Sequence, residues 1–318
     1  MTSSELVQEA FVLTPEYRDY VWGGDRLKPG SRPIAEAWVV YENDRIASGL
    51  LSGRTLADAT AEYGSALLGT RAIQRTGARF PLLIKLLDCA QWLSLQVHPN
   101  DEQAVRLEGA GQFGKTEAWH FIDAELNAEI LCGLQPGATR EQFEQSVRGG
   151  TLLDLMQRLA IHAGDSIFIS PGMIHSLGPG LLAYEVQQTS DITYRVFDWN
   201  RPAMQGRKLH IEQSLAVADV NALARIVPRP LLGDGERRTL VACSYFTLEL
   251  VAGERNSMML DTLGESFHAL TMIKGAAEVE GSDWQLRLGR FETAVIPAAC
   301  HSYRIQPRGF CRILKASA

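Results

Sequence analysis

The sequence predicts a mainly β protein with inserted helices. Three observations lead to this fold class. Short segments with alternating polar and apolar residues recur along the chain, Gly and Pro separate them, and a pattern from the middle of the chain returns near its end. Alternation with a period of two marks a β-strand with one buried face. Many short strands divided by turn residues are typical of a sandwich or a barrel.

The first informative strand is predicted around Gln96. Every second residue from Ser94 to His98 is polar, and the residues between them are apolar. On a strand, this spacing places Ser94, Gln96 and His98 on one face. Further strands are predicted from apolar runs bounded by turn residues, at 166–170, 181–187, 192–198, 239–251 and 290–297.

Helices are expected between these strands. Thr139 is a candidate N-cap, and Glu141 and Glu144 near the start favour a helix at 139–147. Apolar residues at helical spacing predict another at 151–159, and a third should follow Pro99. We therefore expect a helical insertion covering about 100–112 and 137–162, and a helical linker near 209–223.

A weak internal repeat suggests two related β units. An apolar strand and a Pro lead to His175, and a second strand and Pro lead to His301, with four residues from Pro to His in both cases. Chance similarity of two strand ends explains this pattern equally well. We predict a first domain at 1–234, which holds the candidate site below, and a C-terminal β domain at 235–318.

Composition narrows the function classes. The chain has 318 residues, 46% hydrophobic and 21% charged, which is ordinary for a soluble globular protein. A formal charge of −6 argues against nucleic-acid binding through bulk charge, while a local basic pocket can still bind a small anion. No secretory signal, apolar span or C-x-x-C pattern is visible, and the five cysteines are widely spaced. We expect a cytoplasmic protein with reduced thiols and no membrane partner.

Four side chains form a candidate metal-binding set. Gln96 and His98 share a strand face, Glu117 precedes another predicted strand, and His175 follows a Pro-Gly turn. Two imidazoles, a carboxylate and an amide oxygen suit Zn²⁺, with Mn²⁺, Fe²⁺ or Co²⁺ as alternatives. By spacing alone, a single His after such a turn is also compatible with a purely structural role.

Several motifs in the same order resemble a known family. The segment from Gly164 to His175 resembles the second cupin motif, and Gln96-Val97-His98 stands where the first cupin motif has His-x-His. Taken together, the motifs are similar to those of type I mannose-6-phosphate isomerases of the shorter bacterial branch. The resemblance is strong over residues 11–202 and weak beyond them, with matching segments at 17–24, 80–85, 93–100, 114–119, 164–177 and 185–201.

The resemblance implies a fold, a cofactor and a reaction. The fold would be two cupin-type β-barrel (jelly-roll) units, the second degenerate, with one bound Zn²⁺ per chain. The reaction would be interconversion of mannose 6-phosphate and fructose 6-phosphate through an enediol(ate). The implied residues are Gln96, His98, Glu117 and His175 as metal ligands, Lys115, Asp191 and Arg195 as catalytic residues, and Ser94, Lys85 and Arg195 in the substrate and phosphate pocket.

The chain departs from the family at Gly114. Longer members have a His directly before the residue that corresponds to Lys115. An acid–base role for that His is therefore missing here. The general base stays open between Lys115, Asp191 and a metal-bound hydroxide.

Other interpretations of these residues remain. Lys85 could be an edge residue whose amine reaches solvent, Asp191 could cap a turn, and Arg195 could form a structural ion pair. The protein could also be a non-catalytic sugar-phosphate binding protein, a cupin that activates dioxygen, or an isomerase of a different sugar phosphate. We expect a small-molecule partner, no nucleic acid, and a monomer or homodimer.

Overall fold

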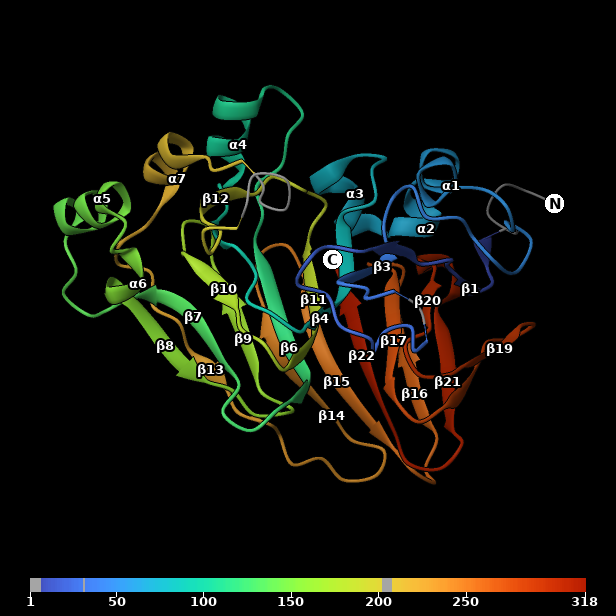
Figure 1. The fold of residues 1–318 in the computed structure, drawn as a ribbon. Coiled ribbons are helices and arrows are strands. Elements are labelled where there is room, and N and C mark those ends of the chain that lie inside the picture. The colour runs from blue at the N-terminus through green and yellow to red at the C-terminus, as the bar shows by residue number, and fades with distance from the viewer. Residues whose placement is uncertain (1–6, 31, 202–207) are drawn as a thin grey trace. The chain divides into compact units, whose positions relative to one another are not determined.

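The computed structural model describes residues 7–30, 32–201 and 208–318. It divides into two compact units (Figure 1). Unit 1 holds the described residues up to Glu16 together with Trp38–Lys85 and Pro230–Ala318. Unit 2 holds the described residues of Tyr17–Ala37 and Leu86–Arg229.

Unit 2 is built from two antiparallel sheets. Five strands form the smaller sheet, in the order β12 (Tyr194–Phe197), β5 (Leu95–Val97), β10 (His175–Leu177), β7 (Glu129–Leu134) and β8 (Met156–Ala160). The larger sheet runs in the order β13 (Ile226–Val227), β9 (Ser166–Ile169), β6 (Glu117–Ala124), β11 (Leu181–Gln188), β4 (Leu82–Cys89), β3 (Glu36–Val40) and β2 (Glu16–Arg18). The chain passes from one unit to the other within β2, β3 and β4, and again between Arg229 and Pro230.

The two faces of the smaller sheet are buried in different cores. One face shares a core with the larger sheet, where Cys132 and Leu177 pack with Trp119 and Ile169. The residues on the other face pack against helices and lie in a separate core with Phe143. Because successive strand residues alternate between faces, β7 contributes Ile130 and Cys132 to the first core and Leu131 to the second.

Two of the described helices of unit 2 begin where the sequence supplies side-chain caps. The described helices of this unit are α4 (Asp101–Glu108), α5 (Arg140–Gly149), α6 (Leu152–Leu155) and α7 (Ile211–Val217). Asn100 and Thr139 each accept a hydrogen bond from the backbone three residues later and form capping boxes for α4 and α5. These side chains satisfy amide groups that the first helical turn leaves without partners.

Unit 1 also contains two sheets, and the two share a hydrophobic core. The order of the larger sheet is β1 (Phe11–Val12), β20 (Thr293–Ile296), β17 (His268–Lys274), β22 (Cys311–Ser317), β15 (Thr247–Gly253) and β14 (Arg237–Ala242). The smaller has β16 (Met258–Asp261), β21 (Ser302–Pro307), β18 (Ala277–Glu280) and β19 (Gln285–Leu288). Its helices are α1 (Leu56–Tyr63), α2 (Ser65–Leu68), α3 (Thr70–Thr76) and a 3₁₀ turn at Ala298–Cys300.

The mainly β fold class is confirmed, although none of the described sheets closes into a barrel. Predicted strands at 166–170, 181–187 and 290–297 correspond to β9, β11 and β20. The domain boundary at 234–235 stays a prediction. The compact units follow another partition, because chain segments before residue 86 join the C-terminal part in unit 1.

Several predicted elements need correction. The segment 239–251 is not one strand, because it turns between β14 and β15, which pair with each other. The helix predicted at 151–159 ends at Leu155, and the chain continues as strand β8 against β7. The strand predicted at 192–198 is shorter and corresponds to β12, and the helix in the linker covers only Ile211–Val217.

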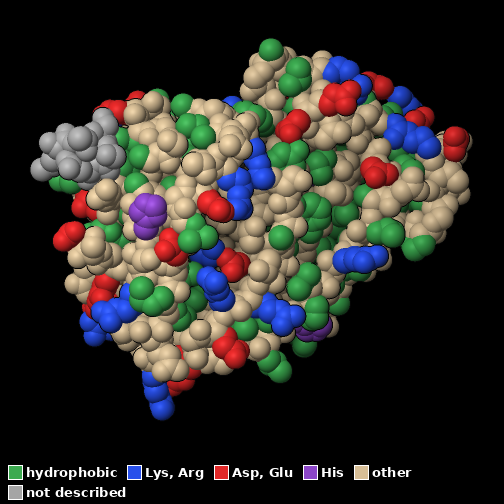
Figure 2. Space-filling model, turned by 180° about the vertical axis from the view of Figure 1, so that it is seen from behind, with side chains coloured by type: hydrophobic (Ala, Val, Ile, Leu, Met, Phe, Trp, Pro, Cys, Tyr) green, Lys and Arg blue, Asp and Glu red, His purple; other side chains and the backbone are tan. Residues whose placement is uncertain are grey.

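The surface shows no segregation of charge on the face drawn in Figure 2, where basic and acidic side chains are interspersed. Among the described residues, no helix has the length and apolar character that a membrane span requires.

Candidate metal centre

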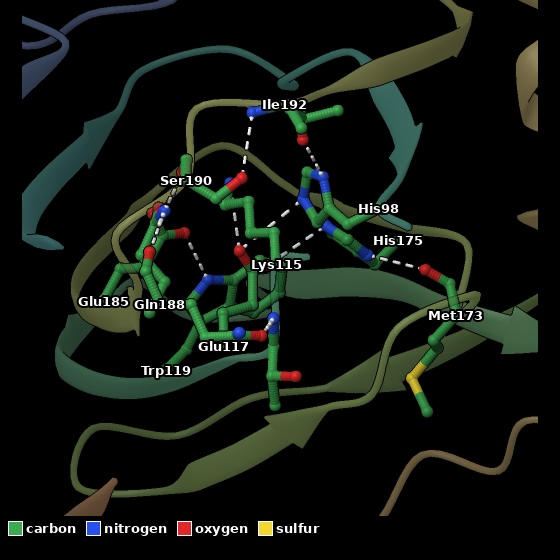
Figure 3. A network of polar contacts seen from close by, with 12 residues as sticks. His98, Lys115, Glu117, Trp119, Met173, His175, Glu185, Gln188, Ser190 and Ile192 are labelled. Carbon is green, nitrogen blue, oxygen red and sulfur yellow. Dashed lines mark hydrogen bonds and ion pairs between the residues drawn. The ribbon is translucent and has the colours of Figure 1, made fainter. Parts of the chain in front are cut away.

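His98, Glu117 and His175 form the candidate metal cluster of unit 2 (Figure 3). His98 directly follows β5, Glu117 opens β6, and His175 opens β10. All three side chains are buried, and one potential ligand atom from each lies within 4.8 Å of the others. Three residues far apart in sequence therefore converge on a volume small enough for one ion.

Strand register explains the convergence. His175 pairs with Gln96 across β10 and β5, and Gln96 pairs with Arg195 across β5 and β12. Residues directly opposite in an antiparallel pair point to the same face. His175 also pairs with Cys132, which belongs to the core between the two sheets. The row Arg195–Gln96–His175 therefore faces that intersheet core.

The imidazoles present their Nε2 atoms to the carboxylate. Nε2 of His98 lies 3.5 Å from Oε2 of Glu117, and Nε2 of His175 lies 3.2 Å from Oε1. The Nδ1 atoms lie 2.9 Å from the carbonyl of Ile192 and 2.8 Å from the carbonyl of Met173. A carbonyl only accepts, so each Nδ1 donates, and in a neutral imidazole with this tautomer Nε2 keeps its lone pair.

Buried polar atoms in the cluster have no hydrogen-bond partner. They are Nε2 of His98, Nε2 of His175 and both carboxylate oxygens of Glu117. Oε2 of Glu117 has an ion pair with Lys115, and leaving the other three atoms unsatisfied costs about 1–3 kcal/mol each. A divalent cation satisfies these atoms together, because neutral imidazole and carboxylate are its usual ligands. The residues present therefore fit a metal ion.

The charge state also suits a cation. Burial is the main reason that the pKa of His98 lies well below its usual value, and the nearby Lys115 amine lowers it further. Burial alone would raise the pKa of Glu117, but Lys115, His98 and His175 hold it well below its usual range. At neutral pH the cluster thus contains a carboxylate and a neutral His98 imidazole, which are the ligand forms that a metal requires.

Lys115 is placed beside the carboxylate by the chain that follows α4. Its Nζ lies 3.1 Å from Oε2 of Glu117, and its side chain is buried. Its backbone nitrogen donates to the carbonyl of Pro99 at 2.9 Å, and the backbone nitrogen of Gly114 donates to Asp101 at 2.7 Å. The start of α4 therefore fixes the segment that carries Lys115 and Glu117.

The remaining predicted residues differ in their positions. Gln96 is half-buried on the face of His175, and Ser94 lies two residues earlier with a buried Oγ that has no hydrogen-bond partner. Asp191 is exposed in the turn after β11, without a hydrogen bond to the cluster among the described residues. Lys85 belongs to unit 1, where its Nζ lies 4.9 Å from the centre of the Trp38 ring. The role of Lys85 in a pocket stays a prediction.

Sequence reasoning missed a polar network around the cluster. Trp119 donates to Glu185 at 2.8 Å, and the Trp119 ring meets the His175 ring edge-on at 5.3 Å between centroids (Figure 3). Gln188 accepts from the Thr116 backbone at 2.9 Å. All of β11 is buried, so alternation could not reveal which of its polar residues face the site. The sequence signal that could have indicated them is the group of polar residues at the end of this otherwise apolar strand.

His210 is a second residue whose position the sequence did not reveal. Its Nδ1 accepts from the backbone nitrogen of Arg195 at 3.3 Å, and its own backbone nitrogen donates to the Arg195 carbonyl at 2.8 Å. Arg195 lies on β12, an edge strand of its sheet. His210 thus holds the backbone of Arg195 by two hydrogen bonds.

Comparisons with known proteins agree with these features. The sequence model of the phosphomannose isomerase type I catalytic domain matches residues 10–113. The mannose-6-phosphate isomerase ManA of Bacillus subtilis is 30% identical over 96% of this chain and 98% of its own length. The mannose-6-phosphate isomerase of Streptococcus mutans is 34% identical over 76% of this chain and 78% of its own.

Solved structures show the same similarity. The crystal structure of the mannose 6-phosphate isomerase from Bacillus subtilis covers 96% of this chain and 99% of its own, with a TM-score of 0.86 and 28% identity. A putative mannosephosphate isomerase from Archaeoglobus fulgidus shares the fold, with a TM-score of 0.77 and 19% identity over 96% of both chains. On sequence, fold and the arrangement of the cluster, this chain belongs to the type I phosphomannose isomerase family.

Proposed function

We propose that this chain is a metal-dependent aldose–ketose isomerase that interconverts mannose 6-phosphate and fructose 6-phosphate. The observation that carries the proposal is the buried His98–Glu117–His175 cluster, whose inward atoms lack hydrogen-bond partners and adjoin Lys115. Relatives that align with nearly the whole chain are named mannose-6-phosphate isomerases. We take the proposed substrate from these names.

Zn²⁺ is the proposed metal, held by His98, Glu117, His175 and the amide oxygen of Gln96. Gln96 enters the set because it is the register partner of His175. Mixed nitrogen and oxygen ligands suit Zn²⁺, and Mn²⁺, Fe²⁺ and Co²⁺ remain the alternatives. When bound, the ion supplies Lewis acidity for the oxygens at C1 and C2 of the sugar.

The protein side chains would supply the remaining chemistry. Isomerisation moves a proton between C1 and C2, and the enediol(ate) carries negative charge on oxygen. Lys115 offers a buried cation for that charge, and Arg195 faces the same intersheet core. Between the candidate bases, buried Lys115 is better shielded from solvent than exposed Asp191, so we propose that its neutral amine takes the proton from carbon and that the resulting ammonium is the cation beside the enediol(ate). Asp191 is then left with a role at the entrance or in ring opening.

Ser94 and Arg195, both in unit 2, are the proposed phosphate contacts, and a pocket role for Lys85 stays a prediction. The buried Oγ of Ser94 has no hydrogen-bond partner and can donate to a phosphate oxygen. Arg195 lies in the same row as Gln96, and a guanidinium matches the geometry of phosphate oxygens. These residues would hold the phosphate away from the metal, so that C1 and C2 reach Lys115.

Finer features of the family are proposed for this chain as well. We infer that both units descend from cupin jelly rolls and that the C-terminal one is degenerate. The repeated strand–Pro–His pattern supports this, although His175 is buried in its cluster while His301 is exposed. We further propose a cytoplasmic enzyme, monomeric or homodimeric, without nucleic-acid or membrane partners. The negative formal charge supports the absence of nucleic acid.

A coupled assay tests the proposed function. Purified protein is given mannose 6-phosphate, and fructose 6-phosphate is measured before chelation, after chelation and after Zn²⁺ is restored. Turnover should vanish on chelation and return with the metal. Glu117→Gln should lose both bound metal and turnover. A zinc-loaded protein that stays inactive would contradict the assignment and favour another sugar phosphate or a binding protein.

A further inference from the structure

Gln187 has a buried amide that is fixed at one end and unsatisfied at the other. Its side chain is fully buried in β11. Nε2 donates to the carbonyl of Gln188 at 3.0 Å and to the carbonyl of Ser190. Because both partners are carbonyls, which only accept, the amide nitrogen and not the amide oxygen must face them. This assigns the orientation of the Gln187 amide. Its Oε1 is buried and has no hydrogen-bond partner among the described residues.

This amide lies on the face of the candidate metal cluster. Gln187 pairs with Glu117 in the register of β11 and β6, so the two side chains share a face. The turn that Gln187 holds through Ser190 continues to Ile192, whose carbonyl orients His98. Gln187 therefore adjoins the cluster both across the sheet and through the turn.

The proposed ligand set of Gln96, His98, Glu117 and His175 does not include Gln187, so Oε1 of Gln187 has no partner assigned to it. A buried acceptor without a donor costs about 1–3 kcal/mol, so the site offers a place for an O–H or N–H group. A dianionic phosphate has no hydrogen to give and would be repelled by an amide oxygen. The matching group is a hydroxyl.

We propose that Oε1 of Gln187 accepts a hydrogen bond from a hydroxyl of the sugar carbon chain, which makes Gln187 a further substrate-binding residue. This inference rests on the proposed function, because it takes the ligand to be a sugar phosphate. Nε2 and Oε1 then have separate tasks: the nitrogen shapes the turn that orients His98, and the oxygen recognises the polyol. A water molecule on the metal is the other source of an O–H donor, and the experiment separates the two.

The test uses a hexitol 6-phosphate, which carries the hydroxyls and the phosphate but has no carbonyl to isomerise. Its binding to zinc-loaded wild-type protein and to Gln187→Leu is measured by calorimetry, with inorganic phosphate as the second probe. We expect the variant to bind the hexitol phosphate roughly three- to tenfold more weakly, as for one neutral hydrogen bond. Inorganic phosphate should bind equally to both proteins.

Two controls separate recognition of the hydroxyl from other effects. Ser190→Ala removes the hydrogen bond from Ser190 Oγ to the carbonyl of Phe113 at 2.7 Å, and so loosens the same turn without changing the Gln187 amide. It should weaken hexitol phosphate binding less than Gln187→Leu does, because Oε1 of Gln187 is kept. Any change in the visible absorption of the Co²⁺-substituted protein should be the same in Gln187→Leu and in Ser190→Ala, because both variants loosen the turn that orients His98 and Oε1 itself does not act on the metal or its water.

Four results would overturn the inference. The first is unchanged binding of the hexitol phosphate to Gln187→Leu, and the second is equal weakening of hexitol phosphate and inorganic phosphate binding in that variant. The third is weakening of hexitol phosphate binding by Ser190→Ala to the same extent as by Gln187→Leu. The fourth is a change of the Co²⁺ spectrum or metal affinity in Gln187→Leu that Ser190→Ala does not share. The proposed function fails separately. A wild-type protein that does not turn over mannose 6-phosphate, yet binds the hexitol phosphate through Gln187, would refute the isomerase and keep the binding residue.

Discussion

A single lysine sets the electrostatics of the candidate metal cluster. Glu117 is completely buried, and an isolated carboxylate there would favour its protonated form. The amine of Lys115 at 3.1 Å keeps the pKa of Glu117 low, and the same amine lowers the pKa of His98. In the metal-free protein, Lys115 thus favours the ligand forms of two residues, the carboxylate of Glu117 and the neutral imidazole of His98.

This arrangement predicts that Lys115→Met separates metal binding from turnover. The bound cation replaces the lysine charge next to Glu117, so we expect the variant to retain one metal per chain. Turnover should fall by about 100-fold or more, as when one preorganised donor to a developing oxyanion is removed. Metal content by elemental analysis and kcat from the coupled assay provide the comparison. Equal loss of metal and activity would mean that Lys115 only supports the ligands.

A second prediction at this scale concerns His210. Burial, Arg195 and Lys208 lower its pKa, while Glu108 raises it; its ring also lies 6.1 Å from that of Tyr194. Protonated His210 cannot accept from the backbone of Arg195, so this hydrogen bond is lost as pH falls through the lowered pKa. His210→Asn keeps an acceptor at the Nδ1 position and has no proton to gain.

We therefore expect His210→Asn to keep kcat/KM near the wild-type value at pH 7.5 and to lose less activity in acid. His210→Ala should be several-fold impaired at every pH. The ionisation of the substrate phosphate affects kcat/KM of all three proteins equally. Differences between their pH profiles therefore come from the proteins. Identical profiles for wild type and His210→Asn would exclude a role of His210 in the acid limb.

Among the elements, α4 determines what can stand before Lys115. A Cβ added at Gly114 would lie 2.5 Å from the backbone carbon of Asn100 and 2.6 Å from the nitrogen of Asp101. Both atoms belong to the capped start of the helix and cannot move without disrupting it. The His of longer family members therefore has no room here, and the difference at this position is tied to the backbone.

Gly114→His tests this steric argument. Restoring the family residue should lower stability by about 1–3 kcal/mol, as for other overpacked sites, and should reduce activity instead of raising it. Thermal unfolding and the coupled assay report the two effects. Gly137→His serves as the control, since a Cβ there meets nothing within 4 Å, although its positive φ of 87° adds some backbone strain. A more active Gly114→His would show that the helix start adapts.

The elements that sequence predicted well are those with a local signal. The strand bearing Gln96 showed alternation, and α5 showed its cap, so both were predictable. The segment 151–159 has helical spacing, but from Met156 it pairs with β7, a partner that no local pattern reveals. The same limit applied to Gln187, because a strand buried on both faces gives no alternation to interpret.

For the molecule as a whole, buried neutral histidines predict sensitivity to acid. Burial lowers the pKa of His268 to about 3 and that of His120 to about 4. The unfolded chain takes up these protons near pH 6.5, whereas the folded protein resists them. Stability is therefore complete above pH 6.5 and falls as the pH drops towards the folded-state pKa, by up to about 1.4 kcal/mol per pH unit for each histidine.

His268→Asn checks this in unit 1. The variant keeps a polar group near Tyr303, the partner of His268 Nδ1 at 2.8 Å, but cannot be protonated. Urea unfolding at pH 7.5 and pH 5 should show a smaller loss of stability in acid than for wild type. Parallel losses in both proteins would mean that His268 is already charged in the fold.

The compact units were the least predictable feature at this scale. Sequence placed one boundary near residue 235, and the last entry of the chain into unit 1 at Pro230 lies close to it. That Trp38–Lys85 joins the same unit depends on contacts between residues far apart in sequence. The repeated strand–Pro–His pattern, ending at His175 and at His301, was the one sequence pattern described above that related segments so far apart in the chain.

The two carbonyls that orient His98 and His175 have an evolutionary consequence. Ile192 and Met173 contribute main-chain oxygen atoms, which every amino acid possesses. The side chains at these positions can drift under selection for packing alone, without loss of the hydrogen bonds that aim the imidazoles. The ligands themselves have no such freedom. Around the imidazoles, the positions that orient the ligands therefore tolerate substitution, whereas a substitution of either ligand removes its metal-binding atom.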